Sequence, residues 1–251
     1  MNLARVEYYF SDFLSKLETR RGVVRGNDEQ RAKAEVVLEV GRRKEESSLM
    51  RLFVDTNVLF VGTMNEDEST QSLSDKVVDR ANVLRFGRPH KLKARGEATS
   101  PSIRVLPGLS FQTWKSWFRT ESDLARIPEA SERVDGFVGR LNEIMARIGR
   151  PFAHRTHQAI RAYVANYPAQ TEDGIRWALS DQIEQRILPK FRGLDPTDHA
   201  AASALDMLRS LVLNDLNDQE LVASIDGARE GHTHQFHWQG VDRAAAEPEL
   251  V

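Results

Sequence analysis

A stretch of chain without hydrophobic periodicity, from Gly87 to Ser110, divides this sequence into two regions of different character. The stretch is rich in Gly, Pro, Lys and Arg, a composition typical of linkers and domain boundaries. Before it, short apolar runs alternate with polar loops, which is typical of an α/β domain. After it, apolar residues recur at helical spacing. The sequence therefore predicts an α/β region followed by an all-helical region.

The first region is predicted to hold a helix, a hairpin and buried strands. Apolar residues at helical spacing predict an amphipathic helix over Glu7–Leu17. The run Val36–Val40, flanked by turn residues, predicts an exposed β-hairpin. Val58–Gly62 is short and continuously apolar, as expected of a central parallel strand covered on both faces. Beyond it we expect a short helix capped by Ser74 and a further strand at Val83–Phe86.

The second region is predicted to be a set of helices. Aromatic residues mark a short helix at 111–118, and apolar residues from Val134 to Ile148 mark a longer one that Gly149 would end. Further helices are predicted at about 153–166, 172–188 and 199–213.

Composition excludes several classes of protein. The chain has 251 residues, no cysteine and a formal net charge of −2. The lack of cysteine excludes a disulfide framework, thiolate zinc sites and a cysteine nucleophile. No apolar run reaches the roughly 18 residues of a membrane span, and the first residues lack the pattern of a signal peptide. We therefore expect a cytoplasmic protein that contacts no membrane, and the near-neutral charge predicts no direct binding to nucleic acid.

Three local patterns have both a functional and a structural interpretation. His232, His234 and His237 could bind Zn²⁺ or Ni²⁺, but no acidic ligand is near in sequence, so we expect a C-terminal tail strand that packs Phe236 and Trp238 instead. The cationic residues of the linker could contact phosphates, yet we expect a solvated linker. We expect the third pattern, an aromatic set, to be core rather than a base-stacking platform; its members are Phe111, Trp114, Trp117 and Phe118.

The motif Phe53–Leu59 resembles the opening of PIN-domain nucleases, in which the aspartate binds a divalent ion. Here the motif lies some fifty residues into the chain, and the run after Asn57 continues as an apolar strand. We therefore expect Asp55 to lie in a polar turn before a buried strand, and we keep a PIN-like metal-dependent nuclease as a weaker alternative.

A different resemblance emerges from four segments taken in order. Residues 1–10 (MNLARVEYYF) resemble the stretch directly after the Walker B acids of AAA+ ATPases of the McrB-like and MoxR-like groups. Val58–Asn65 resembles their sensor 1 strand, and residues 74–83 (SDKVVDRANV) resemble their arginine-finger helix and the following strand. Phe152–Ile160 resembles the lid helix that carries the sensor 2 position, with residues 182–190 as its downstream neighbour.

The resemblance implies roles for three residues. Phosphoryl transfer depends on positioning and on neutralising charge at the γ-phosphate. Asn65 would orient the attacking water or touch the γ-phosphate, and Arg80 would stabilise the transition state in a neighbouring subunit. Arg155 would couple the nucleotide state to the lid angle, a role that Arg150 or Arg161 could serve equally well.

Two of these residues also have ordinary structural alternatives, and the nucleotide stays open. Asn65 could simply cap a turn, and Arg80 could pair with Asp75 or Asp79. In the related restriction GTPases the sensor motif reads Met-Asn-x-x-Asp, whereas here Glu68 stands at the last position. The resemblance therefore implies ATP or GTP with Mg²⁺ without choosing between them.

The sequence lacks the first part of such a module. It contains no Gly-x-x-x-x-Gly-Lys-Ser/Thr loop to hold the phosphates, and it begins at the residue that would follow the Walker B acids. We therefore expect weak nucleotide binding and no hydrolysis by this chain alone. Whether Met1 is a true start or a truncation is open; an in-frame Walker sequence upstream would decide it.

The predicted fold is α/β: an incomplete AAA+ αβα core made of its distal strands, followed by an all-helical lid. We place the partial core at 1–88, a linker at 89–110, the lid at 111–225 and a C-terminal tail at 226–251. The implied function is that of the C-terminal portion of a McrB-like NTPase, whose ring would drive a partner such as a restriction nuclease. A non-catalytic assembly subunit that donates an arginine finger to an active, Walker-competent neighbour is the alternative.

Overall fold

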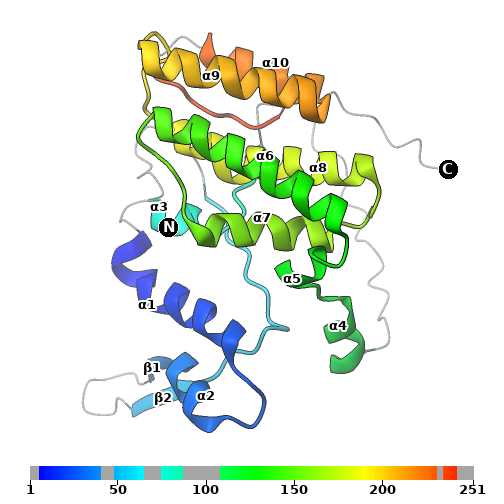
Figure 1. Cartoon of the computed structure of the whole chain (residues 1–251). Coiled ribbons are helices and arrows are strands. Elements are labelled where there is room, and N and C mark those ends of the chain that lie inside the picture. Colours follow the sequence, from blue (N-terminus) through cyan, green and yellow to red (C-terminus); the bar gives the residue numbers. More distant parts are fainter. Residues whose placement is uncertain (1–5, 41–47, 65–74, 87–107, 231–233, 242–251) are drawn as a thin grey trace, which may run out of the picture. The chain divides into compact units, whose positions relative to one another are not determined.

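The computed structural model (Figure 1) describes residues 6–40, 48–64, 75–86, 108–230 and 234–241. The chain divides into two compact units, Met1–Ala81 and Asn82–Val251, called unit 1 and unit 2 below. Each unit is described by itself.

Unit 1 contains short elements and one small sheet. Its elements are α1 (Val6–Thr19) with the 3₁₀ turn Arg20–Gly22, α2 (Asp28–Ala34), β1 (Val36–Val40), β2 (Ser48–Leu52) and α3 (Asp75–Val78). The Asn27 side chain caps α2 by accepting the N–H of Gln30 at 3.0 Å. Strands β1 and β2 pair antiparallel, with Val36 opposite Leu52 and Val40 opposite Ser48. The predicted first helix and the predicted exposed hairpin are thus confirmed.

The predicted strand at Val58–Gly62 is wrong at the level of the element. Val58–Val61 belongs to no helix or strand, and all four side chains are exposed, Val61 by 93%. An apolar run becomes a buried strand only where neighbouring strands pair with it and helices cover it. The sole sheet of the described residues is the hairpin β1–β2, in which Val58–Val61 takes no part. The α/β class itself stays a prediction.

Hydrogen bonds from one arginine, Arg20, hold the backbone at the beginning of this run and just before it. The Arg20 guanidinium donates to the carbonyl oxygens of Val54 at 3.3 Å, Asp55 at 2.9 Å and Val58 at 3.1 Å. The Phe60 ring lies edge-on to Phe13 of α1, with the ring centroids 4.9 Å apart. Phe60 is nevertheless 50% exposed, and Val58, Leu59 and Val61 are exposed as well.

Unit 2 is helical. Its elements are α4 (Phe111–Trp117), α5 (Glu121–Leu124), α6 (Pro128–Arg147), α7 (His154–Asn166), α8 (Glu172–Gln182), the π-helical segment η3 (Ile183–Ile187), the 3₁₀ turn η4 (Leu188–Phe191), α9 (His199–Leu211), the π-helical segment η5 (Val212–Leu216) and α10 (Gln219–Arg229). The predicted helices are confirmed here, while α5 and α10 were not anticipated. The strand predicted at Val83–Phe86 is wrong, because the backbone there belongs to no sheet.

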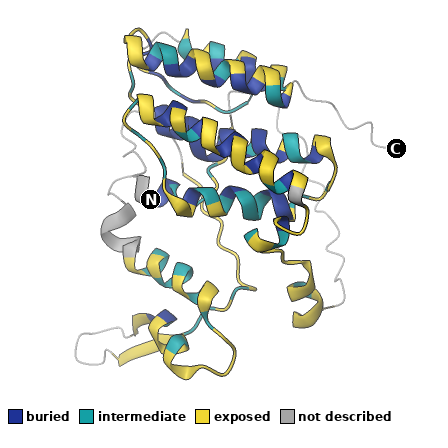
Figure 2. Ribbon diagram, in the orientation of Figure 1, coloured by how far each residue is buried: buried dark blue, intermediate teal, exposed yellow. Residues whose placement is uncertain are grey.

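The core of unit 2 lies between its long helices. Helix α6 packs against α9, and α7 packs against α5 and α8 (Figure 1). Figure 2 shows the buried face of each of these helices. The side chains that are buried almost completely include Leu141, Met145, Ile160, Leu179, Ile183, Ile187, Leu188, Phe191, Leu205 and Leu208.

The segment near the C-terminus completes this core. Phe236 and Trp238 are each 1% exposed, so their predicted packing is confirmed. The predicted strand is wrong, because residues 234–241 belong to no sheet. The Phe236 N–H donates to the carbonyl of Leu194 at 2.7 Å, and its ring lies 5.7 Å from that of Phe191. No helix in the part of the chain that the structure describes is long and apolar enough to cross a membrane.

Candidate functional site

Arg80 is the predicted site residue in unit 1 that the structure positions. It follows α3, whose Val77 and Val78 are buried, and its N–H donates to the Val77 carbonyl at 3.0 Å. Its Nε lies 3.0 Å from Glu18 Oε2 of α1, and the two side chains are 21% and 30% exposed. The partner is therefore a glutamate of another helix, and the arginine keeps part of its surface accessible. Asn65 lies outside the described residues.

The three arginines considered for the sensor 2 role have different surroundings. Arg150 Nη1 donates to the carbonyls of Lys190 and Arg192, the latter at 3.0 Å. Arg161 Nη1 donates to both carboxylate oxygens of Asp135, at 2.5 and 2.6 Å. Both guanidinium groups are thus committed to holding unit 2 together. Arg155 is exposed and lies in the first turn of α7.

Asp135 of α6 forms an ion cluster with His157 and Arg161 of α7. Its Oδ1 also lies 2.8 Å from His157 Nε2. Burial opposes the charge on this carboxyl, but the hydrogen bonds from Arg161 and His157 outweigh burial, so the pKa of Asp135 is lowered. The cluster offers no nucleophile within reach, since Ser131 Oγ contacts Asp135 and not His157. It therefore fixes α6 against α7 rather than forming a triad.

A buried polar group that the sequence did not single out lies on the π-helical segment η3 and the end of α8. Arg186 Nε donates to Gln182 Oε1 at 2.9 Å, and both side chains are buried. The Tyr163 hydroxyl of α7 donates to Asp181 Oδ2 at 2.9 Å. Desolvation, with the hydrogen bond to Asp181, raises the pKa of Tyr163 to about 12. The local sequence carries helical periodicity only, so it gave no signal for a π-helix or for buried polar residues.

The segment that follows Arg80 along the chain docks onto this same part of unit 2. The Val83 N–H donates to the carbonyl of Gln185 at 3.4 Å. Arg85 Nη1 donates to the carbonyl of Trp238 at 3.0 Å. A Cβ at Gly240, whose φ is +98°, would lie 2.4 Å from the Arg85 carbonyl oxygen, so glycine is required there. One backbone bond and one bond from the Arg85 side chain thus join residues 83–85 to η3 and to the C-terminal segment.

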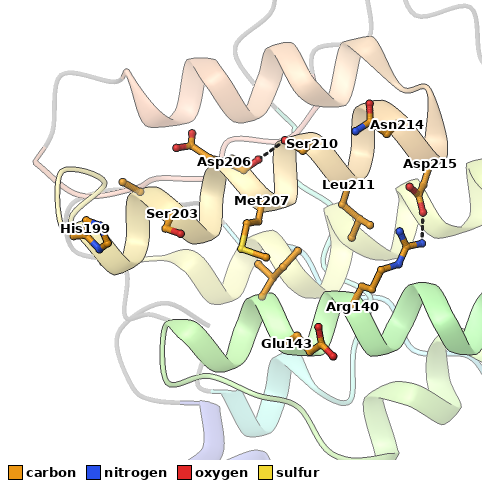
Figure 3. Close-up of a pocket in the computed structure, with 12 residues that line it drawn as sticks. Arg140, Glu143, His199, Ser203, Asp206, Met207, Ser210, Leu211, Asn214 and Asp215 are labelled. Atoms are coloured by element: carbon orange, nitrogen blue, oxygen red, sulfur yellow. Dashed lines mark hydrogen bonds and ion pairs between the residues drawn. The ribbon is translucent and has the colours of Figure 1, made fainter.

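An open groove of about 670 Å³ runs between α6 and α9 (Figure 3). Arg140 and Asp215 of the lining pair with each other at one end, and Asp206 pairs at 2.5 Å with Arg229 of α10, which lies outside the lining. Its apolar lining comes from Ile144, Met207 and Leu211. Because its arginine and both of its aspartates are already in ion pairs, the groove presents no convergent set of groups for chemistry.

The aromatic set at 111–118 is not part of the core, which corrects the expectation from sequence. Phe111, Trp117 and Phe118 are exposed, Trp117 by 60%, and Trp114 is half-buried. Helical spacing placed these rings on one face, but no long helix of the described residues covers that face. Figure 2 shows α4 as an exposed element of unit 2.

The two patterns with metal-binding interpretations remain without a metal site. His232 lies outside the described residues, and His234 is exposed. Asp55 Oδ1 accepts the N–H of Thr56 at 2.6 Å, as expected of a polar turn. Among the described residues, no group of three or more His, Asp or Glu side chains could hold a metal ion.

Comparison with known proteins gives one match. A family model described as a domain of unknown function (DUF8727) matches residues 104–235, which is more than half of the chain of 251 residues. The matched stretch includes every helix from α4 to α10. No curated protein matches the chain, and no solved structure does.

Proposed function

The chain belongs to the DUF8727 family of domains of unknown function, and we propose that it is the C-terminal portion of a McrB-like AAA+ NTPase that is inactive alone. A companion carrying the phosphate-binding loop and the Walker B acids, supplied by another polypeptide or by a preceding part of the same one, would complete the site. The completed NTPase would hydrolyse ATP or GTP as a ring and drive a partner such as a restriction nuclease, in the cytoplasm.

One observation carries this proposal: the exposed apolar run Val58–Val61 lies where the resemblance expects the sensor 1 strand. In a soluble protein a run of four exposed apolar residues calls for a covering partner. Strands of the missing part of the core would provide it, pairing with the backbone and covering both faces. The exposed run is thus what an incomplete sheet is expected to leave behind.

Arg80 supports a role in trans. A finger that stabilises charge in a neighbouring active site must have a fixed base and an accessible tip. The buried α3 and the Glu18 carboxylate supply the fixed base, and the partial exposure of the side chain leaves it accessible. Because Glu18 holds Arg80 by an ion pair that is itself part-exposed, the developing charge on a transferred phosphoryl group could compete for the same guanidinium.

The residues present fit the nucleotide and its metal only in part. Asn65 and Arg155 would contact the phosphates, and Arg155 is exposed as that role requires. The described residues contain no cluster of carboxylates for Mg²⁺. We therefore assign the metal ligands and the phosphate cradle to the companion, and we assign this chain no step that runs through the metal.

The proposal is tested by adding the purified chain to a Walker-competent McrB-like subunit and measuring phosphate release with ATP and with GTP. We expect stimulation that Arg80→Ala lowers by about 10³-fold or more, the usual contribution of an arginine finger. Arg25→Ala is the matched control, because Arg25 is an exposed arginine of unit 1 outside the predicted site.

The result separates the alternatives. Stimulation by the chain that Arg80→Ala leaves unchanged would contradict the arginine-finger role, and no stimulation in any nucleotide would contradict the NTPase assignment. Stimulation that survives Asn65→Ala but not Arg80→Ala would favour the non-catalytic assembly subunit. Cleavage of nucleic acid in Mg²⁺ or Mn²⁺ that Asp55→Asn abolishes would favour the PIN-like nuclease.

A further inference from the structure

Four aromatic side chains lie on α4 and at its end, and are here called the α4 aromatic cluster: Phe111, Trp114, Trp117 and Phe118. Trp114 lies at its centre, 6.2 Å from the Trp117 ring and 5.0 Å from the Phe118 ring, in edge-on geometry. The three outer members are exposed, and Leu109 beside them is exposed as well. Exposed indole and phenyl rings gathered on one short element mark an interaction surface rather than chance exposure.

The cluster is presented on a fixed support. Ser110 caps α4 by accepting the N–H of Thr113 at 3.1 Å. At the other end, the Asn166 side chain of α7 accepts the N–H of Arg119 at 2.9 Å and donates to its carbonyl at 2.7 Å. These two bonds tie the chain after α4 to the helical bundle. The rings are therefore displayed by an anchored element.

The charges within residues 108–120 have one sign. This stretch contains no Asp or Glu, whereas Lys115 and Arg119 are both exposed. The next carboxylate along the chain is the half-buried Glu121, and Asp123 beyond it accepts the N–H of Thr120 at 2.6 Å and pairs with Arg126 at 3.3 Å. The surface thus combines flat aromatic faces with exposed cations, so its ligand should be anionic and should itself offer flat rings.

We propose that the α4 aromatic cluster binds single-stranded nucleic acid, with bases stacked on Trp117, Phe118 and Phe111 and phosphates contacted by Lys115 and Arg119. Stacking on aromatic side chains, combined with cations along the backbone, is the common physical basis of binding to single strands. This inference rests on the exposed rings and on the two cations beside them, a local feature that the near-neutral charge of the whole chain did not indicate. It departs from the expectation of no direct nucleic-acid binding and does not depend on the proposed NTPase function.

An anionic membrane surface would also attract cations and aromatic rings, but α4 fits it less well. The helix is seven residues long, and every apolar side chain in it is aromatic. The remaining residues, Gln112, Thr113, Lys115 and Ser116, are polar. Helices that lie in a membrane interface instead carry a long apolar face that includes aliphatic side chains. The composition therefore favours stacked bases over acyl chains.

The test is a fluorescence-anisotropy titration of the full chain against labelled oligo(dT) of about twenty nucleotides. The matched duplex and vesicles containing phosphatidylserine are measured alongside. We expect the single strand to bind more tightly than the duplex, because only unpaired bases can stack on the rings. We expect raising the salt from about 50 to about 200 mM to weaken binding, since phosphate contacts release counterions.

Two tryptophan variants make the test specific to the surface. Trp117→Ala should weaken binding of the single strand by at least about fivefold, the loss expected for one stacked base. Trp177→Ala is the matched control, because Trp177 of α8 is 55% exposed, close to the 60% of Trp117, and lies outside the cluster. It should leave binding unchanged, and circular dichroism should be the same for both variants.

Several outcomes would overturn the proposal. They are equal losses in Trp117→Ala and Trp177→Ala, equal affinity for the single strand and the duplex, or no binding at about 50 mM salt. Binding to the vesicles but not to the oligonucleotide would transfer the surface to a membrane. Lys115→Glu provides a second readout that does not alter a ring, and it should lower the affinity at low salt more than at high salt.

Discussion

Units 1 and 2 divide the apolar residues of the chain unequally between core and surface. In unit 1 the buried apolar residues are Ala34, Val36, Val77 and Val78, as far as the described residues go. Both faces of its hairpin are exposed at most positions, and so is Val58–Val61. In unit 2, by contrast, α6 to α10 bury a continuous core that the C-terminal segment completes. Figure 2 shows the difference as mainly exposed helices and strands in unit 1 and half-buried helices in unit 2.

The difference teaches that the two units face different physical problems. A helix satisfies its own backbone hydrogen bonds, so the helices of unit 2 need only each other's apolar faces to fold. A strand needs neighbours for its backbone as well as cover for its side chains. Unit 1 contains strand-forming apolar runs with too few neighbouring strands to pair with. Its local structure therefore depends on single contacts, such as the hydrogen bonds from the Arg20 guanidinium to the carbonyls of Asp55 and Val58.

The largest effect that tests this difference between the units is expected when a buried aromatic ring is removed from the core of unit 2. We expect Phe191→Ala to lower the free energy of unfolding of unit 2 by about 3–5 kcal/mol, because Phe191 is fully buried against Phe236. Leu49→Ala in unit 1 removes a side chain that is 75% exposed and should change stability by less than about 0.5 kcal/mol.

The measurement is urea denaturation followed by tryptophan fluorescence and by circular dichroism. All four tryptophans of the chain lie in unit 2, so their fluorescence reports that unit alone. The fluorescence midpoint and the circular-dichroism midpoint should both move in Phe191→Ala. Leu49→Ala is compared by circular dichroism, which also reports unit 1, and its midpoint should stay. A Leu49→Ala variant that unfolds as early as Phe191→Ala would show that unit 1 has a real core.

The next largest effect compares the stability change caused by a glycine-to-alanine substitution in each unit. A Cβ at Gly174, buried at the start of α8, would lie 1.9 Å from the carbonyl oxygen of Ala169, so Gly174→Ala should destabilise unit 2 by about 1–3 kcal/mol or more. A Cβ at Gly62 in unit 1 would meet nothing within 4 Å. Gly62→Ala should therefore be neutral or raise stability by about 0.4–1 kcal/mol, since alanine restricts the unfolded chain.

Thermal unfolding of the two alanine variants checks this pair. The midpoint should fall in Gly174→Ala and not in Gly62→Ala. Equal destabilisation of both would mean that the loop at Gly62 is as tightly packed as the start of α8, contrary to the comparison.

The helical unit was largely predictable from sequence, and the reason is local. Apolar spacing defined α6, α7 and α9 because a helix records its buried face within its own few turns. The apolar spacing did not indicate the π-helical segments or the buried polar pair Gln182–Arg186. Nor did spacing distinguish an apolar face that is covered from one that is not, and the α4 aromatic cluster was misassigned for that reason.

Strands were less predictable, since a strand is defined by partners far away in sequence. Val36–Val40 forms a hairpin because its partner strand, Ser48–Leu52, lies close behind it in the sequence. Val58–Val61 and Val83–Phe86 had the residues of strands but found no neighbours. Among the candidate site residues, Arg80 and Arg155 were chosen by resemblance. The structure added what the sequence could not contain, namely that Arg150 and Arg161 already hold other groups.

A smaller effect concerns the loss of stability at acid pH, to which we expect the carboxylate Asp135 of unit 2 to contribute. Hydrogen bonds from Arg161 and His157 hold the pKa of Asp135 below its usual value, so their stabilisation is present at neutral pH and is lost as the pH falls through that lowered pKa. Asp135→Asn should cost up to about 1 kcal/mol near pH 7 and flatten the acid limb of the stability curve. Urea midpoints from neutral pH downwards measure both effects.

The control for this prediction lies in unit 1. The pair Lys33–Glu29 joins side chains that are 66% and 80% exposed, so Glu29→Gln should leave the acid limb unchanged. An acid limb that flattens equally in Glu29→Gln would place the titrating stability outside the α6–α7 cluster.

The smallest effect is at alkaline pH and involves a single hydroxyl. Burial and the bond to Asp181 raise the pKa of Tyr163 to about 12 from the usual value near 10. A raised pKa in the folded state means that the stabilisation is complete below about pH 10 and declines as the pH rises through about 12. Tyr163→Phe should remove this decline, while Tyr167→Phe, at the residue that follows the end of α7, should retain it. Absorbance titration of the phenolates should likewise lose its latest step in Tyr163→Phe alone. If that step survives in Tyr163→Phe, the late-titrating hydroxyl belongs to another tyrosine. The Tyr163–Asp181 bond would then give no evidence that the interior of unit 2 stabilises buried polar groups in a way that the exposed surface of unit 1 does not.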